Sequence, residues 1–313
     1  DMGGRLSTHS SLLFSRTGND EVKFGAAFKG PRAQVRKTVG LRPNALLLSA
    51  AAAAGIECVQ PVFSFFQNDM AYCVANAFEQ EQPILLDQFK NKTPFSKHLT
   101  SLIKYADFGI SDVKSVPANI PSDIWHQFKE QMKTQIGADE GKLEEAFNIK
   151  NATQLQFTHT GEDSSSAGFG LDNESRGTVA ALSFFSLALR QLSRPTVTLI
   201  DEIDTSLHPT LVAELVALYT DPATNPHGSQ LIFTTHDVSL INQSGSSNRL
   251  LQPDQIWLVE KDKDGASELF PVAELGIRKE ENIGKNYLNG VYGATPNPSF
   301  HTVFAQIMNG DDD

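Results

Sequence analysis

Apolar and polar positions follow two different periods in the first half of the chain. Residues 12–16 and 22–28 are short runs in which apolar residues roughly alternate with polar ones across a turn-like segment, which predicts antiparallel strands. Residues 45–54 are rich in alanine and favour a helix. From 56 to 150, apolar residues recur at helical spacing, as in 71–78, with prolines between the pieces. We therefore expect a helical insertion there, and no coiled coil, because no heptad is sustained.

The second half alternates between apolar strands and amphipathic or buried helices. The run 154–160 predicts a strand, and a loop rich in Gly and Ser follows at 161–170. Further strands are expected at 196–200, 230–235 and 255–260, and helices at 179–192 and 211–219. The predicted fold class is therefore α/β, with a mostly parallel sheet flanked by helices on both faces and a small antiparallel N-terminal part.

Composition and charge narrow the classes of function. The chain of 313 residues is 40% hydrophobic and has no apolar run of about 18 residues, so we expect no membrane span. Two cysteines, Cys58 and Cys73, stand apart, so neither a disulfide framework nor a zinc site is expected, and a cytoplasmic location is favoured. The net charge of −11 argues against coating nucleic acid through bulk charge, but it leaves room for a local basic patch.

Two acids follow the apolar strand at 196–200. In open α/β sheets, ligands bind beyond the carboxyl ends of the strands. Asp201 would hold Mg²⁺, directly or through water, because this ion takes oxygen ligands. Glu202 would orient or deprotonate the water that attacks a γ-phosphate. The alternative is a strand followed by a solvated acidic turn.

The next strand ends in Thr234, Thr235, His236 and Asp237. A histidine at a neighbouring strand tip can donate a hydrogen bond to a phosphate oxygen or to the attacking water. By itself, a histidine such as His236 is more often an ordinary loop histidine. Complementary groups on two strand tips favour a site.

A third candidate precedes the buried helix. Ser175, Arg176, Gly177 and Thr178 would combine free N–H groups at a helix start with a small hydroxyl and a close-approaching glycine, which suits an anion. The alternative is that Ser175 is a plain helix cap.

Together these segments resemble the ABC-type ATPase heads of the SMC-like and overcoming-lysogenization-defect-like group. Residues 199–202 resemble the Walker B strand, and 174–178 resemble a variant signature motif. Residues 205–209 stand where the D-loop would be, and His236 matches the switch histidine.

Other segments are similar to a narrower group, the AAA-labelled, ABC-like ATPases of bacterial abortive-infection and anti-phage operons. These segments are 204–209, 233–237, 41–46 and 286–293. His208 departs from the Asp usual in ABC transporters, but a His-Pro pair is common in the resembled group. The resemblance runs from about 41 to 297 and is weakest at 60–150.

The resemblance implies an ABC-type ATPase head in three parts. Residues 1–55 would be the remainder of the first lobe, with antiparallel strands, and 56–153 the helical insertion. Residues 154–313 would be the second lobe with signature, Walker B, D-loop and switch histidine.

The resemblance also implies ATP and Mg²⁺ as cofactors. Asp201 would be the metal ligand, Glu202 and His236 the catalytic residues, and Asp204 and His208 would join residues 175–178 in binding nucleotide. ATP would lie between two heads of a homodimer or higher homo-oligomer, with hydrolysis opening it. A nuclease or Toprim-like effector is the implied partner and a phage-derived product a possible trigger, while contact with nucleic acid stays open.

The phosphate-cradling loop G-x-x-x-x-G-K-[ST] is absent from this sequence. Residues 30–38 come nearest, but Arg36 stands where Gly is required, so we expect a surface strand or loop there. The expectation is that this chain lacks an N-terminal portion and is inactive alone. The alternative is a natural pseudo-ATPase that uses only its dimerising lobe.

Three functions remain in competition. The first is an ATPase subunit of a defence complex whose ATP state controls an effector. The second is a non-hydrolysing, nucleotide-dependent scaffold that restrains a toxin or nuclease. The third, a metal-dependent nuclease using Asp201, Glu202 and Asp204, is disfavoured because the sequence has no separate acidic cluster of the Toprim type.

Overall fold

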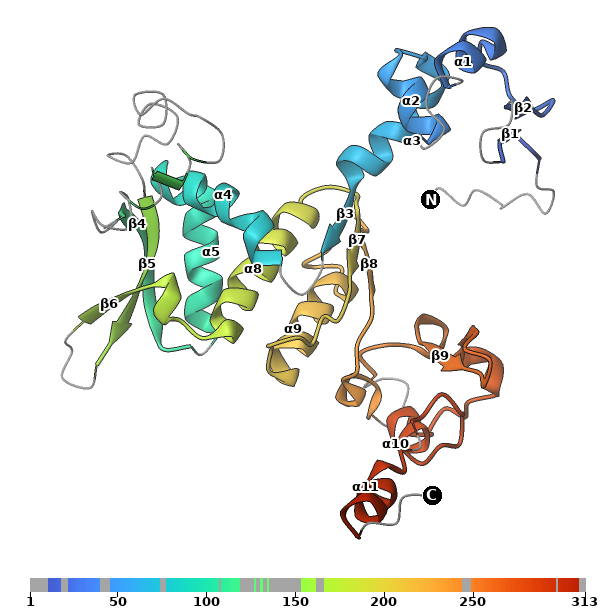
Figure 1. Cartoon of the computed structure of the whole chain (residues 1–313). Helices are drawn as coiled ribbons and strands as arrows, with labels where there is room; N and C mark the ends of the chain where they lie inside the picture. Colours follow the sequence, from blue (N-terminus) through green and yellow to red (C-terminus); the bar gives the residue numbers. More distant parts are fainter. Residues whose placement is uncertain are drawn as a thin grey trace.

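The fold is built around a small parallel sheet, from which other parts of the chain extend in different directions (Figure 1). The computed structural model describes residues 11–17, 22–39, 46–73, 77–106, 108–118, 127, 130–131, 134, 153–161, 166–243, 249–296 and 298–309. None of the helices in these ranges combines the length and the apolar character needed to cross a membrane.

The parallel sheet has the strand order β3-β7-β8. Its strands are β3 (Met70–Cys73), β7 (Val197–Ile200) and β8 (Gln230–Phe233). Cys73 is level with Ile200, and Ile200 with Phe233, so all three strands end at one edge. The helices α8 (Arg176–Gln191) and α9 (Pro209–Thr220) pack on one face of this sheet through buried residues that include Phe184, Leu187, Val212 and Leu215.

The opposite face of this sheet is open within the described part of the chain. Thr198 and Ile200 are buried toward the helices, whereas Tyr72 is 63% exposed and Ile232 is 56% exposed. The expectation of helices on both faces is therefore wrong for the described residues. The strand sequences are apolar on both sides, which is the pattern of a doubly covered sheet.

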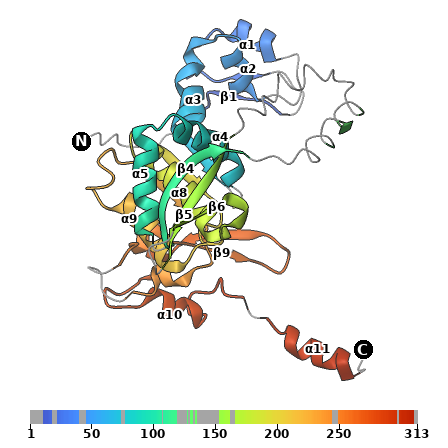
Figure 2. The ribbon, with the colours of Figure 1, turned by 90° about the vertical axis from the view of Figure 1, so that its left-hand side faces the viewer.

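A second, antiparallel sheet has the strand order β4-β5-β6. Its strands are β4 (Ile110–Pro117), β5 (Thr153–Thr160) and β6 (Ser166–Gly170). The helices α4 (Ala77–Lys90) and α5 (Pro94–Tyr105) pack with it, and Figure 2 shows α5 running beside β4. Leu85, Leu99, Ile103, Val113 and Phe157 form this core together with Leu182 of α8.

Helix α8 is shared between the two cores, which explains why its sequence carries almost no charge. Its residues Phe184 and Leu187 face the parallel sheet, while Ala181 and Leu182 face the antiparallel sheet. A partly buried ion pair joins it to α4, because Glu81 pairs with Arg190. Glu81 also accepts a hydrogen bond of 2.8 Å from Ser186 Oγ. Helix α8 therefore couples the two sheets mechanically.

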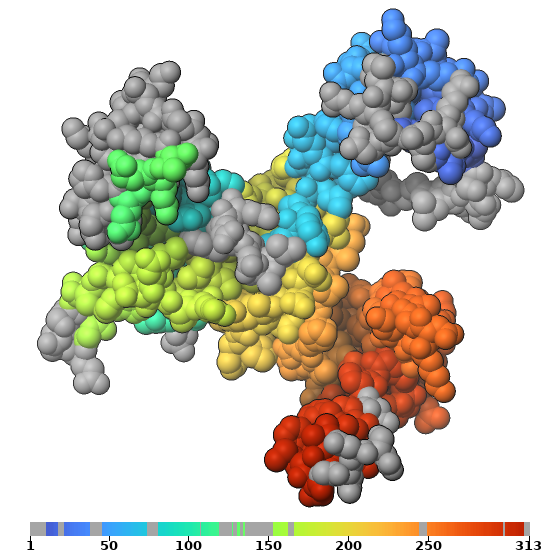
Figure 3. All heavy atoms as spheres, in the orientation of Figure 1, coloured from blue at the N-terminus to red at the C-terminus, as the bar shows by residue number. Residues whose placement is uncertain are grey.

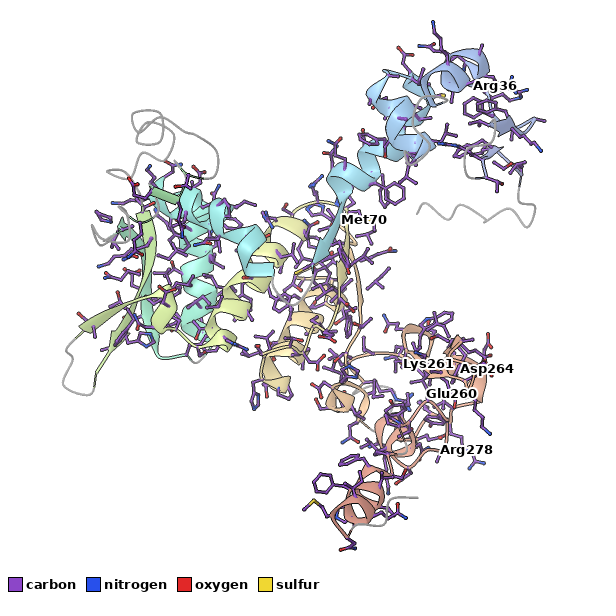
Figure 4. The ribbon with its side chains drawn as sticks, in the orientation of Figure 1. Arg36, Met70, Glu260, Lys261, Asp264 and Arg278 are labelled. Atoms are coloured by element: carbon purple, nitrogen blue, oxygen red, sulfur yellow. The ribbon has the colours of Figure 1, made fainter. Side chains whose placement is uncertain are left out.

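The N-terminal part has a small core of its own, formed by residues such as Val22, Val35 and Ala51. Its elements are β1 (Phe14–Ser15), β2 (Lys23–Phe24), α1 (Arg32–Val39), α2 (Leu47–Ala53) and α3 (Gln60–Ser64). Arg36, labelled in Figure 4, lies 5.5 Å from the Phe24 ring centre and donates to the Val22 carbonyl. This contact fastens α1 to the strand pair.

The C-terminal part begins beyond β8 and contains a hairpin and two helices. Its elements are β9 (Trp257–Lys261), β10 (Ser267–Pro271), α10 (Ile283–Leu288) and α11 (Phe300–Asn309). Ile256, Leu258, Val272 and Ile283 form its core. In Figure 3 this part and the N-terminal part project separately from the middle of the molecule.

Several element predictions need correction. Residues 70–73, expected as part of a helix, form the sheet strand β3, and β4 and β6 are strands in a stretch expected to be helical and in an expected loop. Short apolar runs do not distinguish a buried strand from a helix by periodicity alone. Residues 32–39 form helix α1, not a strand or loop, and β9 pairs antiparallel with β10. The segment 41–45 lies outside the described residues.

Candidate functional site

The ends of β3, β7 and β8 are joined by backbone hydrogen bonds that continue past the strands. Asp201 N donates to the Cys73 carbonyl at 3.0 Å, and Thr234 N donates to the Ile200 carbonyl at 3.0 Å. Ile203 N in turn donates to the Thr234 carbonyl at 3.0 Å. These bonds fix the first residues after β7 and β8 side by side, so the predicted strand tips do meet.

One threonine hydroxyl joins both acids that follow β7. Thr234 Oγ1 donates to Asp201 Oδ1 at 2.6 Å and accepts from the Glu202 backbone N–H at 2.8 Å. The Glu202 carboxylate accepts a weaker bond from Thr205 Oγ1 at 3.3 Å. Asp201 and Glu202 are both exposed, so their carboxylates are accessible to a ligand at the sheet edge.

The backbone of Glu202 adopts an unfavourable conformation. Its φ of 52° lies in the left-handed region, which residues other than Gly, Asn and Asp rarely adopt. The bonds to Thr234 hold it there. Such local strain concentrates at functional positions, where the surrounding structure maintains it.

Asp204 connects the loop after β7 to the loop after β8. Its Oδ1 accepts from Thr235 Oγ1 at 2.7 Å and from the His236 backbone N–H at 3.3 Å. His236 is exposed, and Asp237 caps the following short helix by accepting from Ser239 N at 2.9 Å. Asp204 thus positions the backbone of His236.

The start of α8 is capped by Ser175, as the plain-cap alternative predicts. Thr178 N donates to Ser175 Oγ at 3.0 Å, and the two hydroxyl oxygens lie 2.9 Å apart. Arg176 is exposed in the first turn. The preceding Glu174, whose side chain is 5% exposed, lies 2.8 Å from Nε2 of His159 on β5. This pair ties the helix start to the antiparallel sheet.

The predicted signature and D-loop segments are in direct contact within this chain. A Cβ placed on Gly177 would lie 2.9 Å from the Ser206 carbonyl oxygen, closer than real Cβ contacts. Ser206 has a left-handed φ of 65°. His208 caps α9, because its Nδ1 accepts from Thr210 N at 3.2 Å. With Nδ1 as the acceptor, the ring proton lies on Nε2, and His208 is exposed.

The structure thus assembles two groups of the predicted residues. Asp201, Glu202, Asp204 and His236 share the edge of β7 and β8, and Ser206 links that edge to Gly177. Within the described ranges, no group of three or more His, Cys, Asp or Glu residues is arranged to hold a metal ion. A single exposed carboxylate such as Asp201 still suits Mg²⁺, which usually takes one or two carboxylates with waters and phosphate oxygens.

Sequence reasoning missed the residues that position these groups. Thr234 and Thr235 precede His236 directly, so their place at the strand end was the available signal. His159 and Glu174 are fifteen positions apart on different elements, and no local pattern connects them.

Comparison with known proteins identifies the family. A family model described as "AAA domain, putative AbiEii toxin, Type IV TA system" matches residues 82–242, just over half of the chain. The chain belongs to this AAA-domain family. An AAA domain is a nucleotide-binding ATPase domain, and the matched range of this family member includes α8, β7, α9 and β8 with both groups of predicted residues.

Two other comparisons add little to the AAA-domain assignment. No curated protein sequence matches the chain. A solved structure from work on "ATP-driven dimerization and DNA stimulated activation of SMC ATPases" is similar over 63% of this chain and 98% of its own, with 15% identity and a TM-score of 0.34. A TM-score this low supports no conclusion about this AAA-domain protein.

Proposed function

We propose that the protein is an ATP-binding and hydrolysing subunit of a bacterial anti-phage defence complex. In this proposal, ATP pairs two copies, and the paired state controls a partner effector. The observation that carries the proposal is the arrangement at the end of β7, within the range matched by the AAA-domain family. There Thr234, which follows the neighbouring strand β8, forms hydrogen bonds with both Asp201 and Glu202. The family description also names a toxin–antitoxin system, which supports a protein partner.

Asp201 would be the metal ligand and Glu202 the base. Asp201 offers a carboxylate at the sheet edge, and bound Mg²⁺ would neutralise charge on the phosphate oxygens of ATP. Glu202, with its backbone fixed by Thr234, would accept a proton from the attacking water. His236 would donate to a phosphate oxygen from its position beside Asp204.

Residues 175–178 would meet the nucleotide held by a second copy. Ser175 Oγ accepts the capping bond from Thr178 N and shares a second hydrogen bond with Thr178 Oγ1. Where Thr178 is the donor of that bond, the Ser175 proton would be free for a phosphate oxygen. The first N–H groups of α8 add positive potential at the same point. Because Gly177 touches Ser206, a change at the β7 loop would be transmitted to the helix start.

A second candidate is a nucleotide-dependent scaffold that restrains a toxin or nuclease without hydrolysis. It is favoured by helix α1 (Arg32–Val39), which occupies the segment of this sequence nearest to a phosphate-cradling loop, so no glycine-rich loop forms there. In this candidate, Asp201 and Glu202 would shape the binding edge but activate no water.

The Glu202→Gln variant of the natural full-length protein tests the proposal. We expect ATP binding to be retained and turnover to fall by roughly 10² or more, because a positioned general base contributes 10²–10⁴-fold. Phosphate release and fluorescent-ATP binding are the measurements. Glu214→Gln, on an exposed position of α9, is the matched control and should leave both unchanged.

Each other outcome has a clear reading. Unchanged hydrolysis in Glu202→Gln would sink the catalytic assignment. Tight ATP binding without turnover in the unmodified natural protein would favour the scaffold.

A further inference from the structure

A groove lies between helix α5 and strand β4, in the antiparallel part of the molecule. It has a volume of about 610 Å³. Figure 1 shows that α8 stands between this part and the strand tips of β7 and β8. The groove is therefore separate from the candidate ATPase site.

The groove wall is strongly basic. Five lysines line it against one acid, Asp112; these lysines are Lys90, Lys92, Lys97, Lys104 and Lys114. The ion pairs found among the described residues involve other side chains, so none of these five lysines is neutralised by a described partner. In a chain with a net charge of −11, five lysines in one groove form a local field that attracts an anionic ligand.

The floor of the groove is the free edge of a sheet. Residues 112–117 of β4 all line it, which places the groove along the strand backbone. Among the described strands, β4 pairs only with β5. No backbone hydrogen bond among the described residues reaches 112–117 outside the β4–β5 ladder. Outward N–H and C=O groups of β4 are thus open to a ligand, up to Pro117, which has no N–H.

We propose that this groove binds an extended acidic segment of a partner protein, which pairs with the free edge of β4 as a fourth strand. An added strand would satisfy both the donors and the acceptors of that edge. Lys97 and Lys104 are seven helical steps apart, or about 10 Å, which matches roughly three residues of extended chain. Acidic side chains on the added strand would then reach these ammonium groups.

The chemistry of the groove favours a peptide over nucleic acid. Open carbonyl groups of β4 and the Asp112 carboxylate repel phosphate oxygens, whereas a peptide brings N–H groups to the carbonyls. Phe89, the aromatic residue of the lining, is 5% exposed and offers no surface for base stacking. The hydroxyls of Thr100 and Ser101 already donate to helix carbonyls, at 2.9 and 3.1 Å. The ammonium groups are therefore the main side-chain donors.

A labelled peptide tests the proposal directly. The probe is a fluorescein-labelled octapeptide that alternates glutamate with threonine, titrated with the full chain without nucleotide while anisotropy is measured. We expect saturable binding that weakens as NaCl rises from about 50 to about 500 mM. The Lys97→Glu/Lys104→Glu variant should bind at least about tenfold more weakly, because it reverses the groove charge. Lys263→Glu/Lys279→Glu, on exposed positions outside the groove, should bind normally.

Two further probes separate strand pairing from charge alone. The same peptide with N-methylated backbone amides keeps its charge but loses its donors, so it should bind about tenfold more weakly. Hydrogen exchange at the amides of 113–116 should slow when the unmodified peptide binds, and circular dichroism confirms that each variant is folded. Equal binding of the N-methylated or the glutamine-for-glutamate peptide would overturn the proposal. Displacement of the peptide by duplex DNA or duplex RNA at lower concentration would overturn it as well.

Discussion

Cys73 lies next to the candidate site, and its thiol has low reactivity there. Its carbonyl accepts the backbone bond from Asp201, while its side chain points into the core and is 4% exposed. Burial, with a smaller contribution from the negative charge of Glu81, raises the pKa of the Cys73 thiol to about 11. The thiol therefore stays protonated at neutral pH and is a poor nucleophile or metal ligand.

This raised pKa predicts a loss of stability in alkali. The folded state disfavours the thiolate, so the unfolded chain loses this proton first, and the free energy of unfolding falls as pH rises from about 9 to about 11. Urea unfolding across this range should show a shallower decline for Cys73→Ala than for the unmodified chain. Cavity formation lowers stability at every pH, so the slope is the quantity to compare.

The exposed Cys58 provides the control, since Cys58→Ala should keep the original slope. Burial also raises the pKa of Tyr219, so part of the decline at high pH will remain in every variant. If the decline of stability with pH is as steep in Cys73→Ala as in the unmodified chain, the raised pKa of the Cys73 thiol is not its cause.

At the scale of elements, the start of α8 depends on a glycine. Gly177 sits in the first turn of the helix, where alanine would ordinarily be favoured by about 1 kcal/mol. Its close approach to the Ser206 carbonyl reverses that preference, because the backbone oxygen cannot move as a flexible side chain could. The contact also connects the helix start to the loop after β7.

We predict that Gly177→Ala destabilises the protein by about 1–3 kcal/mol, the range typical of overpacking. Urea unfolding measures the change. Gly170→Ala is the control: the nearest atom to its Cβ, Asn173 Nδ2, is 4.0 Å away, and its φ of −75° suits any residue. That variant should lie within about 0.5 kcal/mol of the unmodified chain. Equal stabilities for the two variants would show that the Gly177 contact is not maintained in solution.

The sequence predicts the elements that carry long periodic or apolar patterns. Helices α8 and α9 and strands β7 and β8 lie close to their expected ranges, and Ser175 is a helix cap. Strand β3 could not be predicted from the sequence, because a run of four apolar residues fits a helix as well as a strand. The antiparallel pairing of β9 with β10 could not be predicted either, because it is set by contacts between the strands and not by their composition. The role of Thr234 and the Gly177–Ser206 contact could not be predicted from the sequence, because each joins segments that are far apart along the chain.

At the scale of the whole molecule, much apolar surface is uncovered. Tyr72 and Ile232 are exposed on the parallel sheet, and Trp257, Val259 and Leu269 on the β9–β10 hairpin. Helix α11 exposes a stripe made of Phe300, Val303, Phe304 and Ile307. Contiguous apolar surface of this kind usually meets another polypeptide.

We predict that Tyr72→Lys/Ile232→Lys lowers both the fluorescence of a bound hydrophobic dye and the self-association seen by sedimentation. Neither side chain is buried, so the thermal midpoint should change little. Tyr105→Lys, at a residue that is 91% exposed on α5, is the control and should leave dye binding unchanged. An equal loss of dye binding in both variants would show that the exposed face of the parallel sheet is not the surface that binds the dye.

The left-handed backbone at Glu202 also limits how this position can vary in evolution. A φ of 52° disfavours β-branched residues and favours glycine or asparagine, so drift without selection would lead away from glutamate. If related sequences keep glutamate at this position, its carboxylate is under selection, because the backbone conformation alone would favour another residue. The pattern of residues found at this position in related sequences would therefore distinguish copies that need the carboxylate from copies that have lost the need.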